Sequence, residues 1–174
     1  MKHILLLRHA KSAWSDLALS DHDRPLNRRG ERAAKAIGDH LAHRGPRPDL
    51  VLCSTAQRAR QTLAPVIKRL GKNTPPIALE ETLYLASEAS LLARLQEVSD
   101  EVATVLLVGH NDGIWRLAEM LAGRGSSANL AALQEKYPTG TLATLQVPDG
   151  PWTDLAAGSG ELLAFVRPRD LMRR

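Results

Sequence analysis

The sequence contains one cysteine, Cys53, and no long hydrophobic run. A single cysteine excludes a disulfide bond within the chain and is typical of a reducing compartment, so we expect a cytoplasmic protein. The apolar residues 4–7 form a stretch far too short to cross a membrane or to act as the core of a secretory signal. We therefore expect neither a membrane segment nor a signal peptide.

Aromatic residues are also scarce, at 3% of the chain, although the formal net charge is +4. A basic protein can bind nucleic acid, but that function usually combines a cationic patch with aromatic side chains that stack on bases. Here the Lys and Arg residues are scattered along the sequence. The composition therefore favours a small anionic ligand over a nucleic acid.

Familiar phosphate-binding motifs are missing as well. The chain has no glycine-rich loop followed by Lys and Ser or Thr, which excludes an ordinary P-loop. A cysteine-dependent phosphatase needs an Arg at a fixed distance after its Cys; after Cys53, Arg58 comes one residue early and Arg60 one late. Cys53 is therefore predicted to be a small buried hydrophobic residue at a strand end.

Three continuously apolar segments, residues 3–7, 49–53 and 104–108, are typical of parallel strands that helices cover on both faces. Helical periodicity lies between and after them. The expected helices follow Asn27, Ser54, Ser87 and Asn111. Strands that alternate with helices in this way indicate an α/β fold.

The rest of the sequence adds shorter elements to this sheet. Residues 75–79 are predicted to form an edge strand, because the two prolines fit only at a strand's start or edge. Residues 141–147 and 161–167 flank a connection rich in Gly, Pro and Asp, which indicates two strands joined by a loop or hairpin. Residues 123–129 are expected to be a mobile loop. We predict one domain over residues 1–174, a three-layer α/β/α sandwich with a mixed, mostly parallel central sheet.

Charged and titratable residues stand where these strands end. Arg8 and His9 follow the first strand, and His110 follows the strand at 104–108. Ligands of open parallel sheets bind outside the carboxyl ends of the strands, so we expect these side chains to share one edge. The middle strand ends at the same edge and leads into a helix that carries Arg58 about one turn from its start, where free backbone N–H groups attract phosphate.

Two arginines and two histidines at one edge suit the chemistry of a phosphoryl group. Arginine grips phosphate oxygens with paired donors and keeps its charge, and histidine can act as a covalent nucleophile on phosphorus. Each residue alone is more often structural, but like charges rarely gather unless an anion separates them. A metal site on His9 and His110 would need a further ligand, for which Asp112 is the nearest candidate. Flanking arginines would repel a cation, so we predict no metal.

Three segments, LLLRHAKS (5–12), CSTAQRARQT (53–62) and LLVGHND (106–112), resemble the signature segments of the histidine phosphatase superfamily, also called phosphoglycerate mutase-like. The short chain, the Ala after Arg-His, and the segments DRPLNRRG and LLAFVRPRDL resemble its SixA-like branch, which contains phosphohistidine phosphatases. This resemblance implies a three-layer α/β/α fold with no metal or organic cofactor.

The resemblance also implies roles for individual residues. His9 matches the family nucleophile, Arg8, Arg58 and His110 complete the catalytic phosphate pocket, and Asn111 is a further candidate for contact with the phosphate. Lys11 stands where the chain leaves the commoner pattern, and we expect it to help select the substrate.

Larger family members place a Glu near the pocket as a proton donor, and here only Glu80 and Glu81 are candidates. Without a strong acid the site suits a phosphoramidate, because imidazole, with a pKa near ~6.5, leaves more easily than an alkoxide. We expect phosphohistidine on a protein, in signal transduction, as the substrate and a monomeric enzyme with no nucleic-acid or membrane partner. The alternatives are a phosphomonoesterase for a small metabolite, with Glu81 or a substrate group as the acid, and a weakly catalytic module that binds phosphoproteins.

Overall fold

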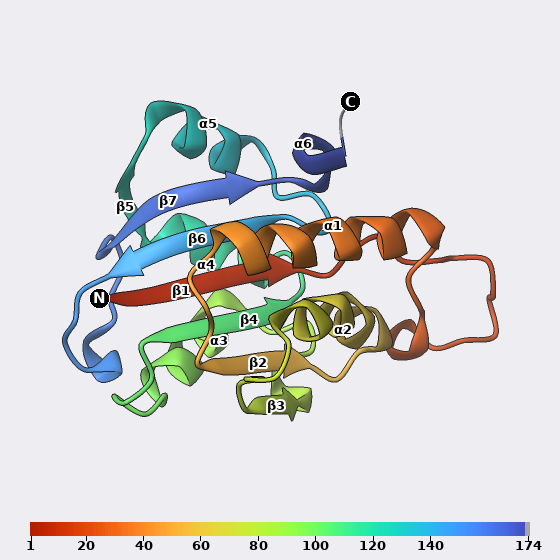
Figure 1. The fold of residues 1–174 in the computed structure, drawn as a ribbon, viewed down its shortest axis with the longest axis horizontal. Helices are drawn as coiled ribbons and strands as arrows, with labels where there is room; N and C mark the ends of the chain where they lie inside the picture. The colour runs from red at the N-terminus through yellow and green to blue at the C-terminus, as the bar shows by residue number, and fades with distance from the viewer. Residues whose placement is uncertain (173–174) are drawn as a thin grey trace.

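A computed structural model describes residues 1–172 as one seven-stranded sheet between layers of helices (Figure 1). The strand order is β3-β2-β4-β1-β6-β7-β5. The strands are β1 (Lys2–Arg8), β2 (Leu50–Ser54), β3 (Ile77–Glu80), β4 (Thr104–Gly109), β5 (Ala122–Gly125), β6 (Leu142–Val147) and β7 (Gly160–Val166). Since β6 runs antiparallel to both β1 and β7, the sheet is mixed, as predicted.

The helices lie on both faces of the sheet. In Figure 1, α1 and α2 cross the near face while α3 and α4 lie behind it. The helices are α1 (Arg28–Arg44), α2 (Gln57–Leu70), α3 (Glu88–Gln96), α4 (Gly113–Leu121), α5 (Ser127–Glu135) and α6 (Pro168–Met172), with single 3-10 turns η1 (Asp21–Asp23), η2 (Glu81–Leu83) and η3 (Trp152–Asp154). The three-layer α/β/α prediction is confirmed.

The core divides along the alternation of side chains in β1. Ile4 and Leu6 point into the layer that α3, α4 and α5 cover, and Leu5 and Leu7 point into the layer under α1 and α2. All four side chains are fully buried. This burial on both faces explains why the strand is apolar at every position and why its polar residues come only after it.

Strand register brings the ends of β1 and β4 together. The two strands are parallel, with Arg8 opposite Gly109, and the backbone N–H of His9 donates to the carbonyl of Gly109 at 3.0 Å. β2 lies on the other side of β4 in the same direction. The carboxyl ends of β1, β2 and β4 therefore form one edge, at the right of Figure 1.

The prediction of a mobile loop at residues 123–129 is wrong, because this segment contains β5 and the first turn of α5. β5 pairs with β7, and Gly123 lies so close to Gly158 that an added Cβ would be 2.0 Å from the Gly158 carbonyl oxygen. Ser126 caps α5, since its side chain accepts from the N–H of Asn129. The glycines that suggested mobility instead allow a close backbone approach.

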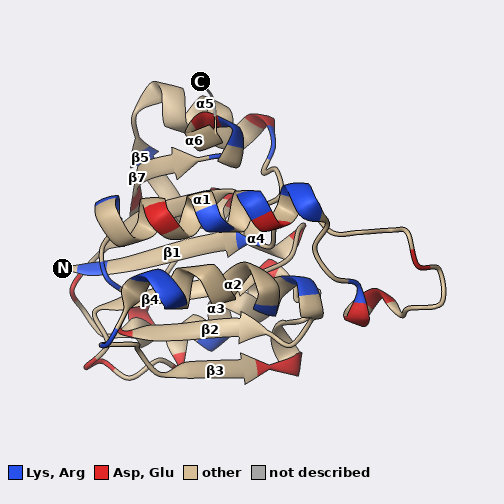
Figure 2. Ribbon diagram, turned by 45° about the vertical axis from the view of Figure 1, so that its right-hand side comes forward, with Lys and Arg blue, Asp and Glu red and all other residues tan. Residues whose placement is uncertain are grey.

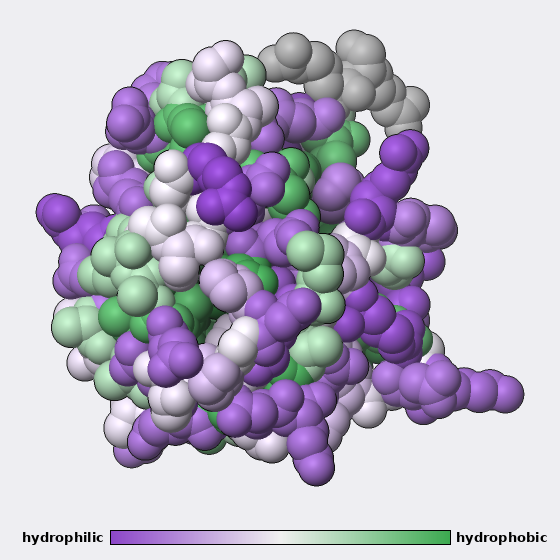
Figure 3. Space-filling model, turned by 90° about the vertical axis from the view of Figure 1, so that its left-hand side faces the viewer, coloured by the Kyte–Doolittle hydropathy of each residue, from purple (hydrophilic) through white to green (hydrophobic). Residues whose placement is uncertain are grey.

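The opposite end of the sheet, where β1 and β4 begin, faces the viewer in Figure 3 and mixes hydrophilic surface with scattered hydrophobic patches. Among the residues that the structure describes, no helix is long and apolar enough to cross a membrane. The predicted burial of Cys53 is confirmed, with none of its surface exposed.

One glycine ties the start of α1 to the loop after β1. Gly30 is packed so that an added Cβ would be 2.1 Å from the backbone oxygen of Lys11. Because backbone atoms cannot move aside as a flexible side chain can, we predict that Gly30→Ala lowers the free energy of unfolding by about 1–3 kcal/mol. Gly150→Ala is the matched control, since its nearest neighbour would be 4.0 Å away. Chemical denaturation measures both, and equal stability of the two variants would contradict the prediction.

Candidate active site

A cavity of about 350 Å³ opens at the carboxyl edge of β1, β2 and β4. Its lining contains every residue predicted to bind or attack the phosphoryl group, and Lys11, together with several residues that were not predicted. The lining residues are Arg8, His9, Lys11, Ser12, Trp14, Arg24, Arg58, Leu85, His110, Asn111 and Thr139. The two imidazole rings are neighbours, with centroids 5.2 Å apart.

His9 is held so that one ring nitrogen faces the cavity unprotonated. Its Nδ1 lies 2.7 Å from the carbonyl oxygen of Ala10, an acceptor, so Nδ1 carries the proton and donates. Burial lowers the pKa of His9 to about 4, with the nearby positive charges of Arg58 and Arg8 acting in the same direction and the bond to Ala10 opposing them. At neutral pH the imidazole is uncharged, and the Nε2 lone pair is available as a nucleophile.

His110 is neutral for similar reasons. Burial, followed by the proximity of His9 and Arg58, lowers its pKa to about 3. Its Nε2 lies 2.8 Å from Ser54 Oγ, and its Nδ1 lies 3.5 Å from a guanidinium nitrogen of Arg58. Because Arg58 can only donate, Nδ1 is the acceptor and Nε2 holds the proton that it donates to Ser54. The ring is thereby fixed beside the cavity.

Arg58, in the first turn of α2, has two short hydrogen bonds and two long contacts. It donates to the backbone oxygen of Asp21 at 2.6 Å and to the Asp21 carboxylate at 3.0 Å. Its contacts with His9 Nε2 and His110 Nδ1 are 3.4 and 3.5 Å, longer than ordinary N–H bonds. The short bonds orient the guanidinium, and the donors on the imidazole side are those that an anion can take.

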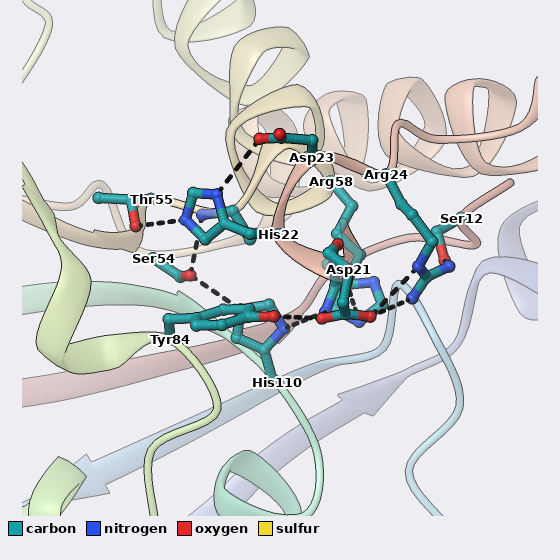
Figure 4. A network of polar contacts seen from close by, with 12 residues as sticks. Ser12, Asp21, His22, Asp23, Arg24, Ser54, Thr55, Arg58, Tyr84 and His110 are labelled. Atoms are coloured by element: carbon teal, nitrogen blue, oxygen red, sulfur yellow. Dashed lines mark hydrogen bonds and ion pairs between the residues drawn. The ribbon is translucent and has the colours of Figure 1, made fainter. Parts of the chain in front are cut away.

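Asp21, in η1, connects most of the charged groups at this edge. Figure 4 shows it between Tyr84 on one side and Arg24 with Ser12 on the other. Its carboxylate accepts from the Tyr84 hydroxyl, from Arg58 and, at 3.0 and 3.2 Å, from Arg24. Burial alone would raise the pKa of Asp21, but these hydrogen bonds lower it well below its usual range. The group therefore remains a carboxylate and is unavailable as a proton donor.

Arg8 lies on the other side of the cavity. It donates to the backbone oxygen of Tyr137 at 2.8 Å, and Asn111 Nδ2 donates to the same oxygen at 3.0 Å. The Tyr137 ring is buried, and its hydroxyl donates to the backbone oxygen of Leu6 within β1. Within residues 1–172 the buried Nε of Arg8 has no hydrogen-bond partner, so this donor is free for a ligand.

The loop after β1 forms the outer rim. The Arg24 guanidinium lies 3.5 Å from the centre of the Trp14 ring and donates to Ser12 Oγ at 2.6 Å. Trp14 and Leu85 line the cavity although 70% and 56% of their surfaces are exposed. Three arginines, a lysine and an apolar rim thus surround the two histidines.

Neither acidic candidate from the sequence reaches the cavity lining. Glu80 forms a two-pronged ion pair with Arg94 at 2.8 and 2.9 Å, and Glu81 is exposed in η2. None of the eleven lining residues in the described part of the chain is acidic. The same part of the chain holds no group of three or more His, Cys, Asp or Glu that could bind a metal ion. The cavity is built for an anion.

Sequence reasoning missed three residues of this arrangement: Asp21, Tyr84 and Tyr137. The charged segment HDRPLNRRGER (22–32) was the nearest signal, and Arg24 within it does line the cavity. Asp21 precedes that segment, and Tyr84 was hidden in a short 3-10 connection. Tyr137 acts through its backbone oxygen, which no side-chain motif can reveal.

Comparison with known proteins agrees with this geometry. Residues 4–84 match the histidine phosphatase superfamily (branch 1). An uncharacterized protein of Mycobacterium tuberculosis is 42% identical over 165 residues, which cover 94% of this chain and 100% of that protein. The fold and the sequence together show that the chain belongs to the histidine phosphatase superfamily.

Solved structures narrow the class. The proposed phosphohistidine phosphatase SixA of Nakamurella multipartitia is 34% identical, with 96% of each chain covered and a TM-score of 0.82. The corresponding SixA structure from Agrobacterium tumefaciens is also 34% identical, with 96% of this chain and 98% of that chain covered and a TM-score of 0.80. The chain is a phosphatase of the SixA-like branch.

The environment of His9 gives a measurable titration. Because burial lowers its pKa, we predict that the His9 imidazole titrates with a midpoint near pH 4 in phosphate-free buffer, instead of near the ~6.5 of a free side chain. Lowering the pH from 7 to 5.5 should leave the ring neutral. Imidazole NMR signals, assigned by their loss in His9→Ala, report the midpoint, and a value near 6.5 would contradict the proposed environment.

The contact between the Arg58 guanidinium and a bound anion can also be tested directly. Lys cannot hold Asp21 while it contacts an anion, so we predict that Arg58→Lys weakens binding of inorganic phosphate about tenfold or more. Arg60→Lys is the control, because Arg60 is exposed and bonds only to Gln57 among the described residues. Calorimetric titration measures both affinities. Equal affinities in the two variants would show that Arg58 does not contact the anion.

Proposed function

We propose that the protein hydrolyses phosphohistidine on another protein through a covalent phospho-His9 intermediate. The observation that carries this proposal is the unprotonated Nε2 of His9, which faces a cavity lined by Arg8, Arg24 and Arg58. These cations neutralise the charge of a phosphoryl group that would otherwise repel a nucleophile. Asn111 and His110 contribute further polar contacts at the same edge.

The reaction follows from this arrangement in two steps. First, Nε2 of His9 attacks phosphorus, a P–N bond forms, and the bond from phosphorus to the substrate imidazole breaks. The departing nitrogen keeps the electron pair and takes a proton from solvent. Arg58 and Arg8 hold the phosphoryl oxygens while charge spreads over them. Water then attacks the phosphoryl group on His9, the P–Nε2 bond breaks, and inorganic phosphate leaves with the restored imidazole behind it.

The leaving group selects phosphohistidine over a phosphate ester. Among residues 1–172 no carboxylic acid lines the cavity, Glu80 is paired with Arg94, and Asp21 stays ionised. An alkoxide would have to leave without a donated proton, whereas a histidine imidazole leaves far more easily. The exposed apolar side chains of Trp14 and Leu85 at the rim also fit a macromolecular surface better than a sugar phosphate.

The decisive experiment compares substrates. We predict that the protein releases phosphate from a phosphohistidine peptide and leaves sugar and nucleotide phosphates nearly untouched. His9→Ala should lower the rate by about a thousandfold or more, because it removes the nucleophile. His43→Ala is the matched control, since His43 is exposed near the end of α1. Faster turnover of any small phosphate ester would overturn the substrate assignment.

Two further measurements separate the alternatives. Glu81→Gln should leave peptide hydrolysis unchanged, whereas an esterase that uses Glu81 as its acid would lose activity. Acid-quenched protein should carry labelled phosphate on His9, and label on another residue would refute the intermediate. Binding of the phosphopeptide without phosphate release would identify a recognition module instead of an enzyme.

A further inference from the structure

A second groove of about 490 Å³ adjoins the cavity and is strongly basic. It lies between the start of α1, the segment before β6, and α6. Of the lining residues that the structure describes, half are Lys or Arg and none is acidic. The lining residues are Lys11, Arg29, Ala33, Lys136, Pro138, Thr139, Arg167, Pro168, Arg169 and Met172. Figure 2 marks in blue the basic residues at the start of α1 and near α6.

The groove shares part of its lining with the catalytic cavity. Lys11 and Thr139 line both of them, one from the loop after β1 and the other from the segment before β6. The backbone N–H of Gly140, next to Thr139, donates to the carbonyl of His9 at 2.9 Å. A ligand bound at His9 therefore lies next to the groove, since two residues of the groove lining also border the cavity.

The charge in the groove is largely uncompensated. Asp170 binds Arg167 at 3.1 Å, but within residues 1–172 neither Arg29 nor Lys136 forms an ion pair. Five basic residues and this one carboxylate leave an excess of four positive charges. The groove therefore places an excess of positive charge beside the active site.

We propose that this groove binds an acidic segment of the substrate protein next to the phosphohistidine. The proposal rests on the proposed function and names the chemistry of its substrate: Asp or Glu residues that flank the modified histidine. Side chains from four separate parts of the fold supply the cations: the loop after β1, the start of α1, the segment before β6, and the segment from the end of β7 into α6. Pro138, Pro168 and Met172 provide apolar surface between the charges. A peptide backbone with several carboxylates matches this pattern better than a single second phosphate.

Paired peptides test the proposal. Two phosphohistidine peptides are compared that differ only in their flanks, acidic in one and neutral in the other. We expect the acidic peptide to have a KM roughly tenfold lower, with similar kcat, and this advantage to shrink with added salt. Arg29→Glu with Lys136→Glu should abolish the advantage. Both residues are exposed and lie outside the catalytic cavity, so hydrolysis of free phosphohistidine should stay within about twofold.

A control variant and the remaining outcomes distinguish peptide binding in the groove from phosphatase activity. The double variant Lys68→Glu with Lys72→Glu changes the charge equally but lies around the C-terminal end of α2, outside the groove, and it should preserve the preference for acidic flanks. If neither peptide is hydrolysed, the proposed function fails, and fluorescence anisotropy with the unphosphorylated acidic peptide still tests the groove. Equal KM values for the two peptides would overturn the groove proposal while the phosphatase stands. The groove proposal would also be overturned if the Arg29→Glu, Lys136→Glu variant lost affinity for a small bisphosphate but kept its affinity for the acidic peptide.

Discussion

The parallel pairing of β1 with β4 determines where the chemistry lies. With Arg8 opposite Gly109, the next residue of each strand is a histidine, and the two rings come within 5.2 Å of each other. A slip of one residue would turn His9 to the other face and break this pairing. The length of the apolar run opposes the slip, because a shift of one residue would move the partly exposed His3 or Arg8 into a fully buried position. Core packing thus fixes the catalytic geometry.

Placing several arginines around two histidines costs free energy because their positive charges repel one another. Hydrogen-bond acceptors around the cavity offset this cost. Arg58 and Arg24 share the carboxylate of Asp21, and Arg8 donates to the backbone of Tyr137. Each guanidinium keeps some of its donors toward the cavity. The histidines contribute no charge of their own, since burial and the arginines lower the pKa of both. The site is therefore preorganised for an anion, with little reorganisation left for the moment of binding.

The parts of the fold that could be predicted from the sequence are those in which a single physical factor, such as burial on both faces, determines the residue pattern. β1, β2 and β4 are apolar throughout because both faces are covered, and the polar residues at their ends mark the edge where the site forms. β5 and α5 were missed because their pairing depends on glycine contacts with distant residues, which resemble a loop in the sequence. Asp21 was missed because it lies in a 3-10 turn, which has no periodicity in the sequence. Its partners Arg58 and Tyr84 are 37 and 63 residues further along the chain.

Arg58 shows how one side chain can serve both the resting and the working state. Its short bonds to Asp21 lie on the side away from the imidazoles, so a phosphoryl group need not displace them. The contacts that the anion replaces are the long ones to His9 and His110, which are weak at 3.4 and 3.5 Å. In the proposed mechanism, binding exchanges these weak contacts for charge-assisted bonds and leaves the Nε2 lone pair of His9 free to attack phosphorus. The carboxylate that holds Arg58 stays ionised and cannot also donate a proton, so the ion pair that orients Arg58 supports the proposed leaving group, which needs no acid.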